Sequence, residues 1–174
     1  MAVRPIDQLK AILILPGTVL VVVPGIILLT TRDVHVGWGF SGAAAAAPIA
    51  VGAVLVAAGA ALGAWTGRLF ATRGQGTPAP WNPPQRLVVA GPYRHVRNPM
   101  ITGAATAVLG EAVLLGSLWL LGWWAVFLVG NHFYFMLSEE PALQRRFGED
   151  YRLYKRNVPR WIPRPTPWDL PDGT

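Results

Sequence analysis

Apolar residues run along this chain in stretches long enough to cross a lipid bilayer. The first stretch lies at about residues 9–29 and the second at about residues 45–70. A further stretch at residues 100–137 is long enough for two helices, with a turn expected at Gly116 and Ser117. Because the hydrocarbon core of a bilayer takes roughly 20 residues of helix, the pattern predicts about four membrane-spanning helices.

Two of these stretches have features that modify the prediction. Pro16 and Pro24 interrupt the first stretch, and we expect kinks there, which membrane helices tolerate. A signal peptide is the alternative for this stretch, although its apolar part is long for one. The arm at residues 100–115 would be only about 24 Å long at 1.5 Å per residue, so we expect it to tilt or to stop short of crossing fully.

Two polar segments separate and follow the apolar stretches. Residues 71–99 contain several prolines, glycines and arginines, which predicts an irregular loop at the membrane surface. In the polar end of the chain, apolar and aromatic residues recur at helical spacing, at Phe147, Tyr151, Tyr154 and Val158. Basic residues take the positions between them, so we expect an amphipathic helix that lies on the membrane or on the loop.

The expected fold is therefore an all-α integral membrane protein of one domain, residues 1–174. Its parts are two spans, a loop, a helical hairpin and a tail, at residues 1–70, 71–99, 100–137 and 138–174. Basic residues gather in the N-terminal segment, the loop and the tail, and Arg32 stands apart from them. The positive-inside rule then predicts that both termini of this cell-membrane or inner-membrane protein are cytoplasmic.

Composition narrows the classes of partner and site. The chain is 52% hydrophobic and only 14% charged, whereas a soluble domain has about 25% charged residues. The net charge is +6, and the basic residues lie beside the apolar segments, so we expect membrane lipids rather than nucleic acid as partners. Cysteine is absent, which removes thiolate metal sites and thiol nucleophiles. The three histidines are far apart in sequence, and we expect no metal.

The segment at residues 91–99 directly precedes the third span and could carry chemistry. Pro99 is well placed at a helix start, whose free N–H groups attract a carboxylate. Arg94 and Arg97 add bidentate donors for the same type of group. The alternative is a positively charged anchor that ends in a proline stop.

A second polar block follows the fourth span. Glu139 and Glu140 are adjacent acids in a basic flank, where they could bind an ammonium or a ribose hydroxyl, or simply pair with nearby arginines. His132 precedes Glu139 by seven residues and shares its helix face. Glu111, in the middle of the third span, is a candidate proton acceptor or substrate contact, although the small residues on its face favour helix packing.

The two blocks together form a long ordered pattern. Gly-Pro-Tyr-Arg-x-x-Arg-x-Pro-Met occupies residues 91–100, and Glu-Glu-x-x-Leu-x-x-x-Phe-Gly-x-x-Tyr-x-x-Tyr-x-x-x-Val-Pro-Arg-x-Ile-Pro occupies residues 139–163. This pattern resembles the isoprenylcysteine carboxyl methyltransferase family, which is related to the membrane phospholipid N-methyltransferases. The resemblance implies a multi-span enzyme that uses S-adenosylmethionine on a lipophilic or prenylated substrate.

The resemblance, together with the polar residues considered above, predicts roles for individual side chains. On the cofactor side we expect a set from the loop, the last spans and the tail: Tyr93, Arg94, His95, Arg97, Asn98, Pro99, Gly103, His132, Glu140, Tyr151 and Tyr154. The expected catalytic residues are Glu139, Glu140 and Arg97, and the expected substrate contacts are Glu111 and Arg160. Asn98 departs from the family, which commonly has His there, and Asn cannot serve as an acid or base.

The residues alone do not identify the methyl acceptor. A carboxylate acceptor needs no general base at neutral pH, whereas an amine or thiol acceptor needs one, and the three glutamates named above are the candidates. A phospholipid or amine N-methyltransferase, an NADPH-dependent membrane reductase and a non-enzymatic membrane scaffold are the alternatives. The sequence has no Walker loop, no Gly-x-Gly-x-x-Gly after a strand and no Gly-x-Ser-x-Gly.

Overall fold

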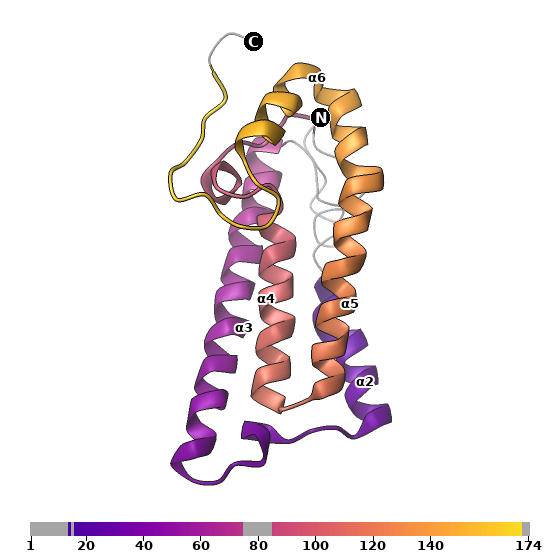
Figure 1. Ribbon diagram of the computed structural model, residues 1–174, viewed down its shortest axis with the longest axis vertical. Helices are drawn as coiled ribbons and strands as arrows, with labels where there is room; N and C mark the ends of the chain where they lie inside the picture. Colours follow the sequence, from indigo (N-terminus) through magenta and orange to yellow (C-terminus); the bar gives the residue numbers. More distant parts are fainter. Residues whose placement is uncertain (1–13, 15, 75–84, 172–174) are drawn as a thin grey trace.

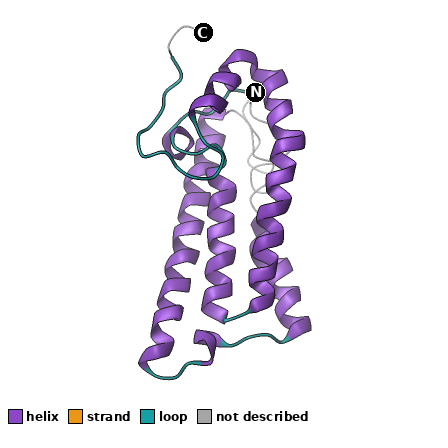
Figure 2. Ribbon diagram, viewed as in Figure 1, coloured by secondary structure: helices purple, strands orange, loops and turns teal. Residues whose placement is uncertain are grey.

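A computed structural model describes residues 14, 16–74 and 85–171 of the chain, and every regular element in these ranges is helical (Figures 1 and 2). The principal helices are α2 at Val23–Thr31, α3 at Ala43–Leu69, α4 at Pro99–Leu115, α5 at Leu118–Tyr134 and α6 at Glu140–Asn157. The prediction of an all-α membrane protein is confirmed.

The helices α2 to α5 lie side by side, with α4 packed between α3 and α5 and with α2 against α5 (Figure 1). Each connection reverses the direction of the chain. As a result, the loop at residues 85–98, helix α6 and the tail all lie at one end of the bundle. We call this the polar end.

Three segments are long and apolar enough to cross a membrane, Thr18–Gly39, Ala43–Gly74 and Leu118–Asn157, whereas the apolar helix Pro99–Leu115 is shorter. The expected count of four spans is therefore not confirmed within the described ranges. The expected first span also begins at residues outside those ranges. Where the prolines predicted a kink, the helix has π geometry at Thr18–Val22, just before α2.

Helices α3 and α4 touch backbone to backbone through glycine. A Cβ atom placed on Gly59 would lie 2.4 Å from the carbonyl oxygen of Gly103 and 2.6 Å from the backbone nitrogen of Ala107. A Cβ on Gly110 would lie 2.6 Å from the backbone nitrogen of Val56. Small residues allow such approach between membrane helices, where van der Waals packing replaces the hydrophobic effect as the main attraction.

The hairpin turn between α4 and α5 lies where the sequence predicted it. Gly116 ends α4 in the left-handed conformation at φ 60°, which glycine adopts without a steric cost. Ser117 then caps α5, and its hydroxyl accepts a hydrogen bond from the backbone N–H of Leu120. Asp33, from the connection between α2 and α3, accepts from the Ser117 hydroxyl at 3.0 Å and from the N–H of Trp119 at 3.3 Å.

At the polar end, α5 and α6 form one continuous helical path. A π-helical turn at Phe135–Glu139 joins them, and the path bends within α6 at Gly148, where φ is 57°. The bend directs Tyr151 and Tyr154 onto the loop, where they are buried near Leu87 and Val89. The amphipathic helix predicted from the sequence therefore lies on the loop.

Candidate functional site

Residues 159–169, which we call the strap, lie alongside residues 91–97 of the loop. Its backbone pairs with the loop at three points: Pro159 O accepts from Arg97 N at 2.9 Å, Arg164 N donates to His95 O at 3.0 Å, and Trp168 N donates to Arg94 O at 3.0 Å. The three contacts place the strap alongside the loop and fix the backbone from which the loop side chains project.

Side chains add to the connection between strap and loop. His95 Nδ1 lies 2.9 Å from the carbonyl oxygen of Arg164, and Arg94 forms an ion pair with Asp169. The Tyr154 hydroxyl donates to the backbone carbonyl of Tyr93 at 2.7 Å. These contacts join three parts of the chain that are far apart in sequence.

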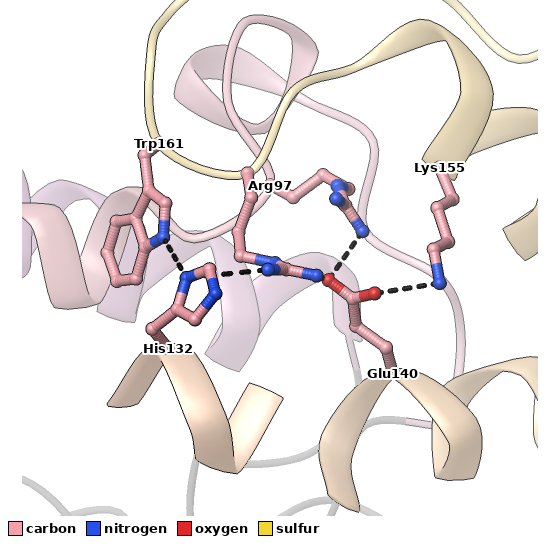
Figure 3. Close-up of polar contacts among 6 residues, drawn as sticks. Arg97, His132, Glu140, Lys155 and Trp161 are labelled. Atoms are coloured by element: carbon pink, nitrogen blue, oxygen red, sulfur yellow. Dashed lines mark hydrogen bonds and ion pairs between the residues drawn. The ribbon is translucent and has the colours of Figure 1, made fainter. Parts of the chain in front are cut away.

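Glu140, at the start of α6, is the centre of the polar end. Its Oε1 accepts from Arg97 Nη1 at 2.7 Å and from Arg160 Nε at 2.7 Å (Figure 3). Its Oε2 forms an ion pair with Lys155 Nζ at 2.8 Å. The loop, the strap and α6 each supply one of these cations to a carboxylate whose side chain is 5% exposed.

The surrounding charges keep the Glu140 carboxylate ionised. Burial alone would raise the pKa of Glu140, but hydrogen bonds from Arg160 and Lys155 and the charge of Arg97 bring it below its ordinary value of 4.5. Three cations around one anion leave a local positive surplus. A second anionic group, such as the carboxylate of an amino acid, would be attracted there.

Glu139 has a different environment from its neighbour. It lies beyond Leu137, where the apolar part of the helical path ends. Burial, with a further contribution from the Glu140 charge, raises the pKa of Glu139 to about 7. Two adjacent carboxyl groups therefore differ in protonation, one ionised and one able to exchange a proton near neutral pH, which is the arrangement that separates acid–base roles in enzymes.

His132 extends the cluster along α5. Its Nδ1 lies 3.2 Å from the Trp161 indole nitrogen and 3.5 Å from Arg160 Nη1 (Figure 3). An indole N–H and a guanidinium can only donate, so Nδ1 is the acceptor and the ring proton of the neutral imidazole lies on Nε2. The strap thereby sets the tautomer of a histidine that projects from the bundle.

The tyrosines of α6 are buried beneath the strap. Burial, followed by the Glu140 charge, raises the pKa of Tyr151 to about 12, and burial raises the pKa of Tyr154 further. Both phenols therefore remain protonated. The ring of Tyr154 packs against that of Trp168, with centroids 6.0 Å apart, so this tyrosine links the strap, the loop and α6.

Two arginines of the loop each keep one guanidinium nitrogen that pairs with no acceptor among the described residues. The Nε atoms of Arg94 and Arg97 are buried and have no hydrogen-bond partner among the described residues. A buried unpaired donor on a charged group costs free energy until an acceptor reaches it. These donors and the surplus positive charge fit the carboxylate of S-adenosylmethionine, so the residues present suit that cofactor.

The remaining sequence-predicted residues lie along α4. Asn98 occupies the cap position without a side-chain hydrogen bond to the helix, and Pro99 is the buried first residue. Gly103 belongs to the contact with α3. Glu111 lies about 18 Å along the helix from Pro99, at 1.5 Å per residue, and its buried Oε2 has no partner among the described residues. Ligand roles for these four residues stay predictions.

Sequence reasoning missed Lys155 and Trp161 as members of the site. Lys155 reaches Glu140 because Gly148 bends α6, and a glycine inside a helical pattern was the available signal. Trp161 reaches His132 through the path of the strap, which no local pattern specifies.

Comparison with known proteins identifies a family for the chain. A family model described as phospholipid methyltransferase matches residues 47–150, more than half of the chain. The chain belongs to this family. The resemblance inferred from the sequence is confirmed, because isoprenylcysteine carboxyl methyltransferases belong to the same superfamily. No curated protein and no solved structure matches the chain.

Family membership makes this protein a membrane methyltransferase. The matched range includes the arginines of the loop and the Glu139–Glu140 pair, and it ends before Tyr151 and the strap. Within residues 14, 16–74 and 85–171, no group of three or more His, Asp or Glu side chains is placed to hold a metal ion.

Proposed function

We propose that the protein transfers a methyl group from S-adenosylmethionine to a membrane lipid at the polar end of the bundle. The observation that carries the proposal is the buried Glu140 carboxylate with its three cations. It lies at the polar end of the bundle, on the helical path Leu118–Asn157, which is long and apolar enough to cross a membrane, in a member of a methyltransferase family. S-adenosylmethionine, when bound, supplies an electrophilic methyl group on a sulfonium.

Different side chains around Glu140 bind different groups of that cofactor. Arg97 and Arg94 present buried donors for its carboxylate. Glu140, which stays ionised, takes its amino group or a ribose hydroxyl. The strap holds Arg94, His95 and Arg97 in register through its backbone hydrogen bonds, so the binding groups are positioned before the ligand arrives.

Glu139 supplies the proton acceptor if the lipid is an amine. An ammonium headgroup must lose a proton before its nitrogen lone pair can attack the methyl carbon. The Glu139 carboxyl group, with a pKa of about 7, can take that proton near neutral pH. The neutral amine could then accept the methyl group that S-adenosylmethionine would supply, so we favour a phospholipid amine, in agreement with the family description.

A carboxylate acceptor is the second candidate. It is favoured by the isoprenylcysteine methyltransferase-like pattern at residues 139–163 and by the surplus of cations around Glu140. This reaction needs no general base, so Glu139→Gln separates the two cases. The variant should lose methylation of phosphatidylethanolamine at least tenfold and should retain methylation of a prenylcysteine carboxylate.

The first experiment is equilibrium binding to the detergent-purified protein. We expect saturable binding of S-adenosylmethionine and S-adenosylhomocysteine. Binding should weaken in Arg97→Ala and also in Arg97→Lys, because lysine lacks the planar fork. Arg152→Ala is the matched control, since Arg152 is exposed and pairs with Glu149 outside the cluster.

Two outcomes would overturn the proposal. Binding of NADPH in place of the adenosyl ligands would assign the protein to a reductase. A folded sample that binds none of the three would indicate a scaffold that retains the family architecture without its activity.

A further inference from the structure

The two carboxylate oxygens of Glu140 have different partners. Oε1 accepts hydrogen bonds from Arg97 Nη1 and Arg160 Nε, both at 2.7 Å. Oε2 forms an ion pair with Lys155 Nζ at 2.8 Å, and no other residue in the described ranges pairs with it. In Figure 3 the lysine reaches the carboxylate on the side away from His132. One flexible side chain therefore covers one of the two oxygens of the central carboxylate.

The bend in α6 brings Lys155 to this position. Along a straight helix, residues 140 and 155 would be separated by about 22 Å at 1.5 Å per residue. Gly148, with φ at 57°, redirects the helix between them. After the bend, Tyr151 and Tyr154 are buried, whereas the side chain of Lys155 is 42% exposed. The backbone that carries the lysine is therefore held in place, and the lysine side chain itself is free to move.

Of the three cations around Glu140, Lys155 is the easiest to displace. The side chains of Arg97 and Arg160 are largely buried, and that of Lys155 is not. A guanidinium group is a preorganised planar fork, whereas the lysine ammonium is a point charge on a flexible stem. Water also screens a partly exposed ion pair, which makes it weak. A ligand can therefore replace Lys155 at small cost and leave both arginines bound to Oε1.

The group best suited to replace Lys155 is another primary ammonium, which has the same charge and the same three donors. S-adenosylmethionine carries one on its amino-acid portion. If that ammonium joined the site without displacing the lysine, a fourth cation would be placed beside three others, and they would repel it. Exchange of one ammonium for the other avoids this repulsion and keeps Glu140 paired with three cations.

We propose that Lys155 holds the ammonium position on Glu140 Oε2 in the free protein and that the α-amino group of S-adenosylmethionine displaces it on binding. The inference rests on the proposed function and selects the amino group, rather than a ribose hydroxyl, as the partner of Glu140. Lys155 is thus a competitor of the cofactor and not a contact to it. Removal of Lys155 should strengthen cofactor binding, whereas removal of Arg97 should weaken it.

Two variants and two ligands test this by equilibrium binding to the detergent-purified protein. Lys155→Met removes the ammonium, and Arg156→Met is the matched control, because it removes the same charge from the next residue, which is exposed. The ligands are S-adenosylhomocysteine and its analogue that lacks the α-amino group and keeps the carboxylate. Lys155→Met should lower the Kd of S-adenosylhomocysteine by about two- to fivefold, as expected when a weak competing ion pair is removed. The Kd of the analogue should stay the same, and Arg156→Met should change neither value.

A second measurement uses the wild-type protein and needs no variant. The sequence has only two lysines, Lys10 and Lys155, so a short pulse of an acetylating reagent followed by peptide mass spectrometry reports each amine separately. Saturating S-adenosylhomocysteine should raise the rate of Lys155 acetylation relative to Lys10 by about twofold or more, because the displaced amine no longer pairs with the carboxylate. The analogue without the amino group should leave the rate unchanged.

The outcomes separate this inference from the proposed function. If Lys155→Met weakens the binding of S-adenosylhomocysteine or leaves it unchanged, the lysine is not a competitor and the inference alone is overturned. An equal gain for both ligands would assign Glu140 to a group other than the amino group and would also overturn it. Acetylation of Lys155 that S-adenosylhomocysteine leaves unchanged or slows has the same consequence. A folded wild-type protein that binds neither ligand overturns the proposed function and the inference together.

Discussion

Glu140→Gln tests the physical basis of the polar end most directly. The substitution keeps the size of the side chain and an oxygen acceptor, and it removes the one negative charge that Arg97 and Arg160 share at 2.7 Å. The two guanidinium groups then repel each other in a buried site. We expect a large loss of thermal stability and loss of cofactor binding.

The magnitude follows from how deeply each partner is buried. The Arg97 side chain is 9% exposed and the Arg160 side chain is 17% exposed, so both pairs are largely removed from water. Breaking such a buried pair by removing one partner costs about 3–5 kcal/mol. The Lys155 side chain is 42% exposed, and screening by water limits its contribution to about 1 kcal/mol or less.

Thermal unfolding in a mild detergent, followed by intrinsic fluorescence, measures this loss. For a domain of this size, each 1 kcal/mol corresponds to about 2–4 °C in Tm, so a decrease of roughly 6–20 °C is expected. Glu149→Gln is the matched control, because Glu149 pairs with Arg152 where both side chains are more than half exposed. A Glu140→Gln protein that melts within 2 °C of the control would refute the argument that this carboxylate stabilises the three segments.

Three further predictions follow from other parts of the structure. With a phospholipid amine as acceptor, kcat/KM should rise with pH through about 7, because Glu139 loses its proton there. Glu139→Gln should remove that rise, and a pH profile that the substitution leaves unaffected would exclude Glu139 as the base. Gly59→Ala should destabilise the bundle by about 1–3 kcal/mol through overpacking, because the new Cβ atom would lie 2.4 Å from the carbonyl oxygen of Gly103. Gly63→Ala is the control and should leave Tm unchanged, because a Cβ atom there meets no atom within 4 Å. Asp33→Ala should lower Tm by removing an acceptor at the start of α5, and a Tm equal to that of the wild type would contradict this capping role.

Much of the fold could be predicted from the sequence because it depends on local patterns. Apolar length predicts the helices of the bundle, and Gly116 followed by Ser117 predicts the turn between α4 and α5, since one ends a helix and the other caps the next. The periodic aromatic residues of α6 likewise predict the face that Tyr151 and Tyr154 bury. Each of these features is decided within about four residues of the chain.

The site was harder to predict because its contacts join distant residues. Glu140 pairs with Arg97, which lies 43 residues earlier in the chain. The sequence does not indicate whether such an arginine pairs with a carboxylate or faces lipid headgroups. The continuity of α5 with α6 through a π turn, and the bend at Gly148, also decide which side chains meet. Neither feature changes the apolar pattern from which the helices were inferred.

The strap explains why two adjacent glutamates can serve different purposes. Arg160 and Trp161 are consecutive residues of the strap, and they bind Glu140 and His132 respectively. Arg160 therefore helps to keep Glu140 ionised, whereas burial and the charge of Glu140 shift Glu139 toward its protonated form. If the strap were displaced, Glu140 would lose one of its charged partners, and the difference between the two carboxyl groups would decrease. A segment beyond the family-matched range thus supports both the proposed cofactor contact and the proposed proton acceptor.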